Sequence, residues 1–106
     1  MFARMLEFKV KPEMEKDFLK TVREEVMPIM KKQFGFFDVL AFRADAHLEK
    51  HIVISLWNRK IDAEKYETEK FLKVNEILRP YLHTPITVTP YEVETTVSEK
   101  VLAIAA

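Results

Sequence analysis

The first ten residues alternate between apolar and other side chains. One parity carries the residues Phe2, Leu6, Phe8 and Val10. An alternation of this kind has the period of a β-strand. Pro12 then suits the first turn of a helix, where its missing N–H is not needed. We therefore predict a strand over residues 2–10, followed by a helix.

Apolar residues next recur every three or four positions, which is the period of a helix. They are Met14, Phe18, Val22, Val26, Ile29 and Met30. Pro28 lies inside this pattern and should kink the helix or split off a last turn. Gly35, the only glycine, follows at the place of a left-handed C-terminal cap.

Two strands that are apolar on both faces follow, at 36–43 and 51–58. Strict alternation places Phe36 with Leu40 and Phe42 on one face of the first strand. The polar stretch 44–50 predicts a hairpin, so the two strands should be antiparallel neighbours. The second strand, rich in β-branched and aromatic residues, is typical of the centre of a sheet.

The second half of the chain repeats the helix-then-strand order. Asp62 is the expected N-cap of the second helix, with Ile61 and Tyr66 as a hydrophobic staple. The helix should continue to Pro80, with a break near Thr68. A last strand is expected over 86–97, where a change of phase at Pro90 predicts a bulge or an edge position.

This order predicts an α+β, ferredoxin-like βαββαβ fold with a four-stranded antiparallel sheet and both helices on one face. The other face of the sheet would remain apolar and bare. We therefore expect a homodimer whose sheets pack face to face as a dimeric α/β barrel. Residues 1–106 should form a single domain with its core at about 2–97, and the tail 98–106 could contact the partner.

Composition limits the function classes. Seventeen basic residues balance seventeen acidic ones, so no electrostatic footprint for nucleic acid or an anionic membrane is present. The absence of cysteine excludes disulfides and thiolate chemistry. Charges interrupt the apolar N-terminus, so we expect a cytoplasmic protein without a signal peptide. We expect no metal, because the histidines show no ligand spacing, and no other cofactor.

The segment 52–58, Ile-Val-Ile-Ser-Leu-Trp-Asn, followed by 62–66, Asp-Ala-Glu-Lys-Tyr, resembles the antibiotic biosynthesis monooxygenase family of dimeric α+β barrel proteins. The stretches 8–12 and 35–37 fit the same pattern. The resemblance implies a pocket between sheet and helices in each subunit. In relatives it takes aromatic polyketides, quinols, haem or unknown small molecules, and some members oxygenate them without metal or flavin.

The haem-degrading members of the family carry an Asn in the first strand, a helix Trp nine residues after the strand-end Trp, and a His nine or ten residues further on. Here these positions hold Leu6 or its neighbours, Tyr66, and Asn75 or Glu76. An imidazole is the usual axial ligand of haem iron. Haem degradation is therefore disfavoured.

Several side chains have both a functional and a structural interpretation. Tyr66 is a candidate catalytic donor or acid, yet the staple also explains it. Trp57 could stack on a planar substrate, although packing is the favoured interpretation. Arg4 shares the parity of Phe2 and could bind an anionic substrate on the helix side, but we favour a side chain that reaches solvent.

Two further candidates belong to predicted loops or strand ends. His83 could act as a catalytic base near neutral pH, although a solvated loop histidine is commoner. Asn58 could orient a substrate carbonyl or simply end its strand. His47 and His51 should also lie in or beside loops.

Three functions remain open. The chain could be a cofactor-independent monooxygenase whose bound phenolic or quinol anion reduces O2 directly. It could instead bind a small apolar or aromatic molecule without chemistry. In the third hypothesis it is an assembly unit whose own Phe and Met side chains fill the interior. The resemblance favours the first.

Overall fold

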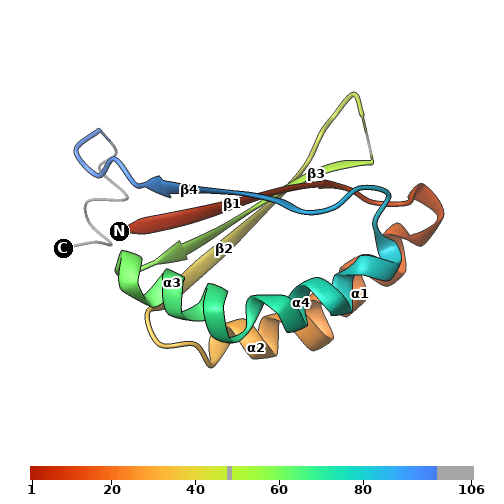
Figure 1. Cartoon of the computed structure of the whole chain (residues 1–106). Coiled ribbons are helices and arrows are strands. Elements are labelled where there is room, and N and C mark those ends of the chain that lie inside the picture. Colours follow the sequence, from red (N-terminus) through yellow and green to blue (C-terminus); the bar gives the residue numbers. More distant parts are fainter. Residues whose placement is uncertain (48, 98–106) are drawn as a thin grey trace.

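The computed structural model describes residues 1–47 and 49–97. Four strands, β1 (Phe2–Lys9), β2 (Phe36–Arg43), β3 (Lys50–Trp57) and β4 (Thr87–Glu92), form one antiparallel sheet in the order β2-β3-β1-β4. The helices α1 (Glu15–Thr21), α2 (Met27–Lys31), α3 (Lys60–Glu69) and α4 (Phe71–Leu78) all cover one face of it (Figure 1). The predicted ferredoxin-like α+β fold is confirmed.

The two central strands and the helices share the core. Every second residue of β1 and β3 points towards the helices, and the paired positions Phe2 with Trp57 and Phe8 with His51 are buried. The first helical region contributes Phe18, Val26 and Met30, which belong to its predicted apolar stripe. The second contributes Ala63, Tyr66, Val74 and Leu78. The core therefore lies between one sheet face and the helices.

Pro28 divides the first helical region, as the sequence predicts. A π-helical turn, Val22–Val26, separates α1 from α2, and the N–H of Met27 bonds to the Val22 carbonyl five residues earlier. In a regular α-helix the Pro28 ring would clash with the carbonyl of Glu24. The wider turn just before Pro28 avoids that contact and lies against the core.

Gly35 has φ +79°, which confirms the left-handed cap after α2. Its carbonyl accepts a hydrogen bond from the N–H of Asn58, 2.8 Å away, at the end of β3. A Cβ at this position would overlap the Asp62 side chain. Glycine is thus required here both by the backbone conformation and by the close approach of α3.

The predicted start of the second helical region is wrong. Helix α3 begins at Lys60 with Arg59 as its N-cap, so Asp62 falls inside the first turn, where its carboxylate accepts hydrogen bonds from the Arg59 guanidinium at 3.0 and 3.2 Å. Ile61 is 60% exposed and does not staple Tyr66. The break between α3 and α4 lies at Lys70, close to the predicted Thr68.

Strand β2 departs from strict alternation. A bulge between Phe36 and Asp38 shifts the register, so Phe36 lies on the helix side, where it packs edge-on against Trp57 with ring centroids 5.6 Å apart. The prediction that Phe36 shares a face with Leu40 and Phe42 is therefore wrong. An extra residue in a bulge reverses the face of everything before it.

Strand β4 is shorter than the predicted 86–97. It pairs with β1 alone and its register runs through Pro90 without a bulge. Of the two predicted explanations for Pro90, the edge position is confirmed, because an edge strand does not need every N–H. The predicted tail contact of residues 98–106 lies outside the described residues.

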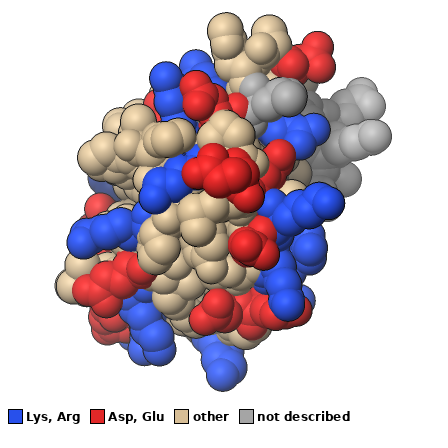
Figure 2. Space-filling view, turned by 90° about the vertical axis from the view of Figure 1, so that its right-hand side faces the viewer, with Lys and Arg blue, Asp and Glu red and all other residues tan. Residues whose placement is uncertain are grey.

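The outer face of the sheet remains uncovered in the single chain. Leu40, Phe42 and Tyr91 are each about half exposed there, beside the partly buried Ile52 and Ile54. Basic and acidic side chains are mixed over the surface shown in Figure 2. Within the described part of the chain, none of the helices is long and apolar enough to cross a membrane.

Candidate functional site

A small cavity lies between the sheet and the helices. Its volume is about 60 Å³, and its walls combine the inner sheet face with the π-helical turn, α2, α3 and α4. The lining residues are Arg4, Leu6, Phe8, Phe18, Val22, Val26, Met27, Met30, Val39, Val53, Ser55, Tyr66, Val74 and Leu78. The wall is therefore apolar except at Arg4, Ser55 and Tyr66.

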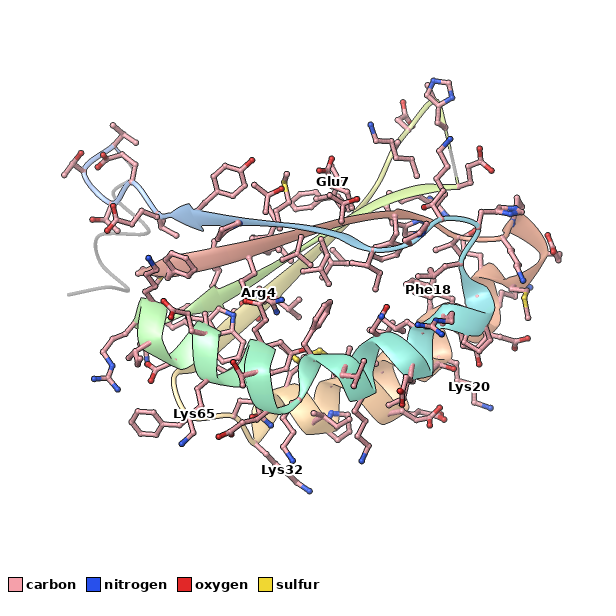
Figure 3. The ribbon with its side chains drawn as sticks, in the orientation of Figure 1. Arg4, Glu7, Phe18, Lys20, Lys32 and Lys65 are labelled. Carbon is pink, nitrogen blue, oxygen red and sulfur yellow. The ribbon has the colours of Figure 1, made fainter. Side chains whose placement is uncertain are left out.

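Arg4 contributes a buried charge to this wall. It is 2% exposed, so the expectation that it reaches solvent is wrong; Figure 3 shows it directed from β1 into the space between sheet and helices. Its Cζ lies 4.6 Å from the ring centroid of Phe71 and 5.2 Å from that of Tyr66. Two cation–π contacts thus stabilise the guanidinium inside the protein.

The Arg4 charge is only partly compensated. Its Nη2 lies 3.8 Å from Oε1 of Glu67, whose side chain is 54% exposed, and has no hydrogen-bond partner among the described residues. Burial lowers the pKa of Arg4, and the Glu67 carboxylate opposes this effect. A buried donor without an acceptor is costly, so an anionic or carbonyl oxygen placed here would gain a strong, charge-assisted hydrogen bond.

Tyr66 lies beside Arg4 on α3. Its ring stacks on Trp57 with centroids 5.1 Å apart and an interplanar angle of 30°. Burial raises the pKa of Tyr66 to about 12, against the opposing influence of the Arg4 charge. At neutral pH the hydroxyl is therefore a hydrogen-bond donor and not a base.

Trp57 supports the site from behind. It is fully buried and absent from the cavity lining, and its indole Nε1 donates a 3.0 Å hydrogen bond to Oγ of Ser55. That bond leaves the Ser55 hydroxyl proton available as a donor towards the cavity. Of the two interpretations of Trp57, packing agrees with the structure, while stacking on a substrate in this cavity does not.

The other two candidates lie away from the cavity. His83 is exposed in the loop before β4, and Asn58 is exposed at the end of β3. His83 lines a separate open cleft with Asn75, Arg79 and Thr84. The structure therefore brings Arg4 and Tyr66 together, but does not bring His83 or Asn58 to them.

His51 lies in β3 beside the hairpin loop, as predicted, and its side chain is buried. Its ring stacks on Phe8 with centroids 6.0 Å apart, and its Nε2 lies 4.0 Å from Oε1 of Glu15, which also pairs with Arg43 at 2.6 Å. His51 shares the parity of Trp57 in β3 and therefore faces the helices. Residues 1–47 and 49–97 contain no group of three His, Asp or Glu side chains placed to hold a metal.

Sequence reasoning missed three residues of this site. Ser55 is the one hydroxyl in an apolar strand and shares the parity of Trp57, a signal that could have identified it. Phe71 and Glu67 reach Arg4 only through the packing of α3 and α4 against β1. No local pattern predicts that contact.

No protein-family model matches the chain, and no curated protein matches its sequence. Solved structures do match its fold. A monooxygenase from the gene ActVA-Orf6 of Streptomyces coelicolor, in complex with the ligand nanaomycin D, has a TM-score of 0.75 at 14% identity, over 92% of this chain and 90% of that chain.

Two further structures agree. A variant of SnoaB, a cofactor-independent oxygenase from Streptomyces nogalater, has a TM-score of 0.69 at 18% identity, over 92% of this chain and 97% of that chain. An antibiotic biosynthesis monooxygenase has a TM-score of 0.69 at 17% identity, over 89% and 99%. At such identities the match shows the fold alone. The chain therefore has the α+β fold of the antibiotic biosynthesis monooxygenases.

Proposed function

We propose that the chain is a cofactor-independent monooxygenase that oxidises a small phenolic or quinol-like molecule at Arg4 and Tyr66. One observation carries this proposal. A buried guanidinium with a nitrogen that lacks a hydrogen-bond partner among the described residues lies beside a protonated tyrosine, in a cavity that is otherwise apolar except at Ser55. Such a site favours a flat apolar molecule with one anionic oxygen.

The residues have distinct roles in this reaction. Arg4 stabilises the substrate anion and so lowers the pKa of the bound phenol or enol. Tyr66 donates a hydrogen bond to the oxygen that becomes charged. The anion transfers electrons to O2, and when a ring CH2 is converted to a carbonyl, one oxygen atom enters the product and the other leaves as water. The apolar walls exclude bulk water from the reacting anion.

The size of the cavity requires it to widen when a ligand binds. Its volume is about 60 Å³, whereas a cavity that accepts benzene measures about 150 Å³. Met27 and Met30 form one wall, directly after the π-helical turn. Methionine side chains change rotamer at low cost, so this wall is where we expect the cavity to open.

A second candidate function is binding without chemistry. Among the described residues that line the cavity there is no carboxylate or imidazole, and His83, the proposed base, lies elsewhere. A substrate whose pKa is too high for Arg4 to ionise it would bind but would not react. This observation keeps the binding function as the alternative.

We also propose that the working unit is a homodimer. The outer sheet face presents Leu40, Phe42 and Tyr91 to solvent, and the removal of such side chains from water favours association by about 25 cal/mol per Å². A second copy offers an identical face and a symmetric solution. The sheets would then pack face to face, with one cavity on the far side of each sheet.

Oxygen uptake by the purified, metal-free protein tests the proposed function. We would compare a panel of quinols, anthrones and flavonoid-like phenols with wild type, Tyr66→Phe and the matched control Tyr81→Phe. Tyr81 is half-buried, and its hydroxyl accepts a 2.9 Å hydrogen bond from Thr21 outside the cavity. Uptake that needs only protein and falls in Tyr66→Phe alone supports the proposal.

Two other outcomes would count against it. Uptake that falls equally in both variants would show that Tyr66 acts through stability. Calorimetric binding of the panel compounds without oxygen uptake would favour the binding function instead.

A further inference from the structure

An open cleft lies on the outer side of Arg4, between α3 and the edge strand β4. Its volume is about 320 Å³. Lys60, Glu64 and Glu67 border it on the helix side, and Val88 and Pro90 on the strand side. The cleft is thus both apolar and charged, and its three charged residues on the helix side all belong to α3.

Arg4 belongs to both spaces. It lines the internal cavity and also the cleft, so its side chain lies between the two spaces. The ion pairs around the cleft are loose, with 3.8 Å between Arg4 and Glu67 and 4.0 Å between Lys60 and Glu64. Pairs of this kind, with one or both partners exposed, contribute little and exchange easily.

We propose that this cleft is the entrance to the cavity and that Glu67 is a specificity-determining residue. This inference rests on the proposed binding of an anionic aromatic molecule. In the empty protein Glu67 partly compensates the Arg4 charge. A ligand enters by replacing that carboxylate with its own anionic oxygen, while its apolar part passes into the cavity.

The proposal explains why a neutral ligand is disfavoured. A neutral ligand must separate Arg4 from Glu67 without offering a negative charge in return. An anionic ligand restores the charge interaction inside the protein, where the low dielectric strengthens it. Glu67 therefore competes with every anionic ligand, and its removal should strengthen their binding.

Calorimetry with 2-naphthoate and its neutral analogue 2-naphthamide tests this competition. In wild type we expect tighter binding of 2-naphthoate. Glu67→Gln should tighten 2-naphthoate about fivefold, the size of a partly exposed ion pair. It should tighten 2-naphthamide less, because the amide gains only the release of Arg4 from Glu67, whereas the carboxylate also escapes repulsion by Glu67. Glu69→Gln, on the same helix and outside the cleft, changes the net charge equally and should leave both affinities unchanged.

The entrance is tested by association rates. Lys60→Trp places a bulky side chain at the cleft, whereas Lys65→Trp makes the same change on α3 outside it; Figure 3 shows Lys65 pointing away from the sheet. We expect stopped-flow fluorescence of 2-naphthoate to show association slowed about tenfold in Lys60→Trp alone.

Each other outcome overturns a distinct statement. Equal effects of Glu67→Gln and Glu69→Gln, equal rates in the two tryptophan variants, or no binding of either probe would overturn the entrance and the role of Glu67. Oxygen uptake that depends on Tyr66 would still support the monooxygenase in that case. Conversely, the expected binding pattern without oxygen uptake from any quinol would retain the entrance and overturn the monooxygenase.

Discussion

Both faces of the sheet are mainly apolar, but the charged side chains on the two faces have different environments. On β1 the side chains of Arg4 and Glu7 point to opposite faces (Figure 3). Arg4 is enclosed by aromatic rings on the helix side, whereas Glu7 lies on the uncovered face. The covered face holds the Arg4 charge in a fixed position, as a binding site requires. The uncovered face instead provides an apolar surface on which a partner can pack.

The largest effect should distinguish a closed core from an open surface. Phe18 is 2% exposed and packs edge-on against Phe8, whereas Phe42 on the outer face is 50% exposed. We expect Phe18→Ala to lower the free energy of unfolding by about 3–5 kcal/mol. Urea unfolding at low protein concentration should show less than half that loss for Phe42→Ala. Equal losses would mean that the outer face is closed even in the single chain.

The second largest effect is the pH dependence of stability, which should differ between Tyr66 on the covered face and Tyr91 on the outer face. The pKa of Tyr66 is raised to about 12, from about 10 in the unfolded chain. Below pH 10 both states hold the proton and Tyr66 adds no pH dependence. Between about pH 10 and 12 the folded state alone keeps it, so stability should fall by about 2–3 kcal/mol as the pH rises.

Unfolding in urea from pH 8 to pH 11.5 measures this fall. Tyr66→Phe should remove most of it, whereas Tyr91→Phe on the outer face should retain it. Lysine titration affects both variants alike and cancels in the difference. The same slope in both variants would contradict the burial of Tyr66.

The third effect tests the outer face as an interface. Leu40 is 46% exposed on β2, and Leu72 is 68% exposed on the solvent side of α4. A charge at a buried apolar contact costs at least about 2 kcal/mol, or roughly 30-fold in Kd. Sedimentation should therefore show that Leu40→Asp dissociates the dimer and that Leu72→Asp does not. A wild-type mass of 12.5 kDa at micromolar concentration would contradict the dimer itself.

Sequence patterns correctly predicted those structural features that depend only on residues close together in the chain. The alternation of β1, the helical stripe and the left-handed Gly35 all follow from local geometry. The position of Phe36 could not be predicted in the same way, because one bulged residue leaves no trace in a periodic pattern. The N-cap failed similarly: Asp62 is a good capping residue, but its carboxylate is engaged by Arg59 inside the first turn.

The site shows the same limit more strongly. Parity alone placed Arg4 on the helix side, but its burial depends on Tyr66 and Phe71, more than sixty residues away in the chain. Local reasoning weighs the cost of burying a charge and favours solvent. The sequence around Arg4 does not reveal the two distant aromatic rings that offset that cost.

The smallest expected change in stability is that of Arg4→Met. This variant distinguishes most directly between a binding role and a structural role for the covered face. Arg4→Met keeps much of the side chain's volume and removes a buried donor that lacks a partner, while Glu67 is left exposed and solvated. We expect the free energy of unfolding to stay constant or rise by about 1 kcal/mol. Binding of 2-naphthoate should weaken in the same variant. A charge that lowers stability and raises affinity is kept for binding, whereas a loss of stability in Arg4→Met would make Arg4 a structural residue of the core.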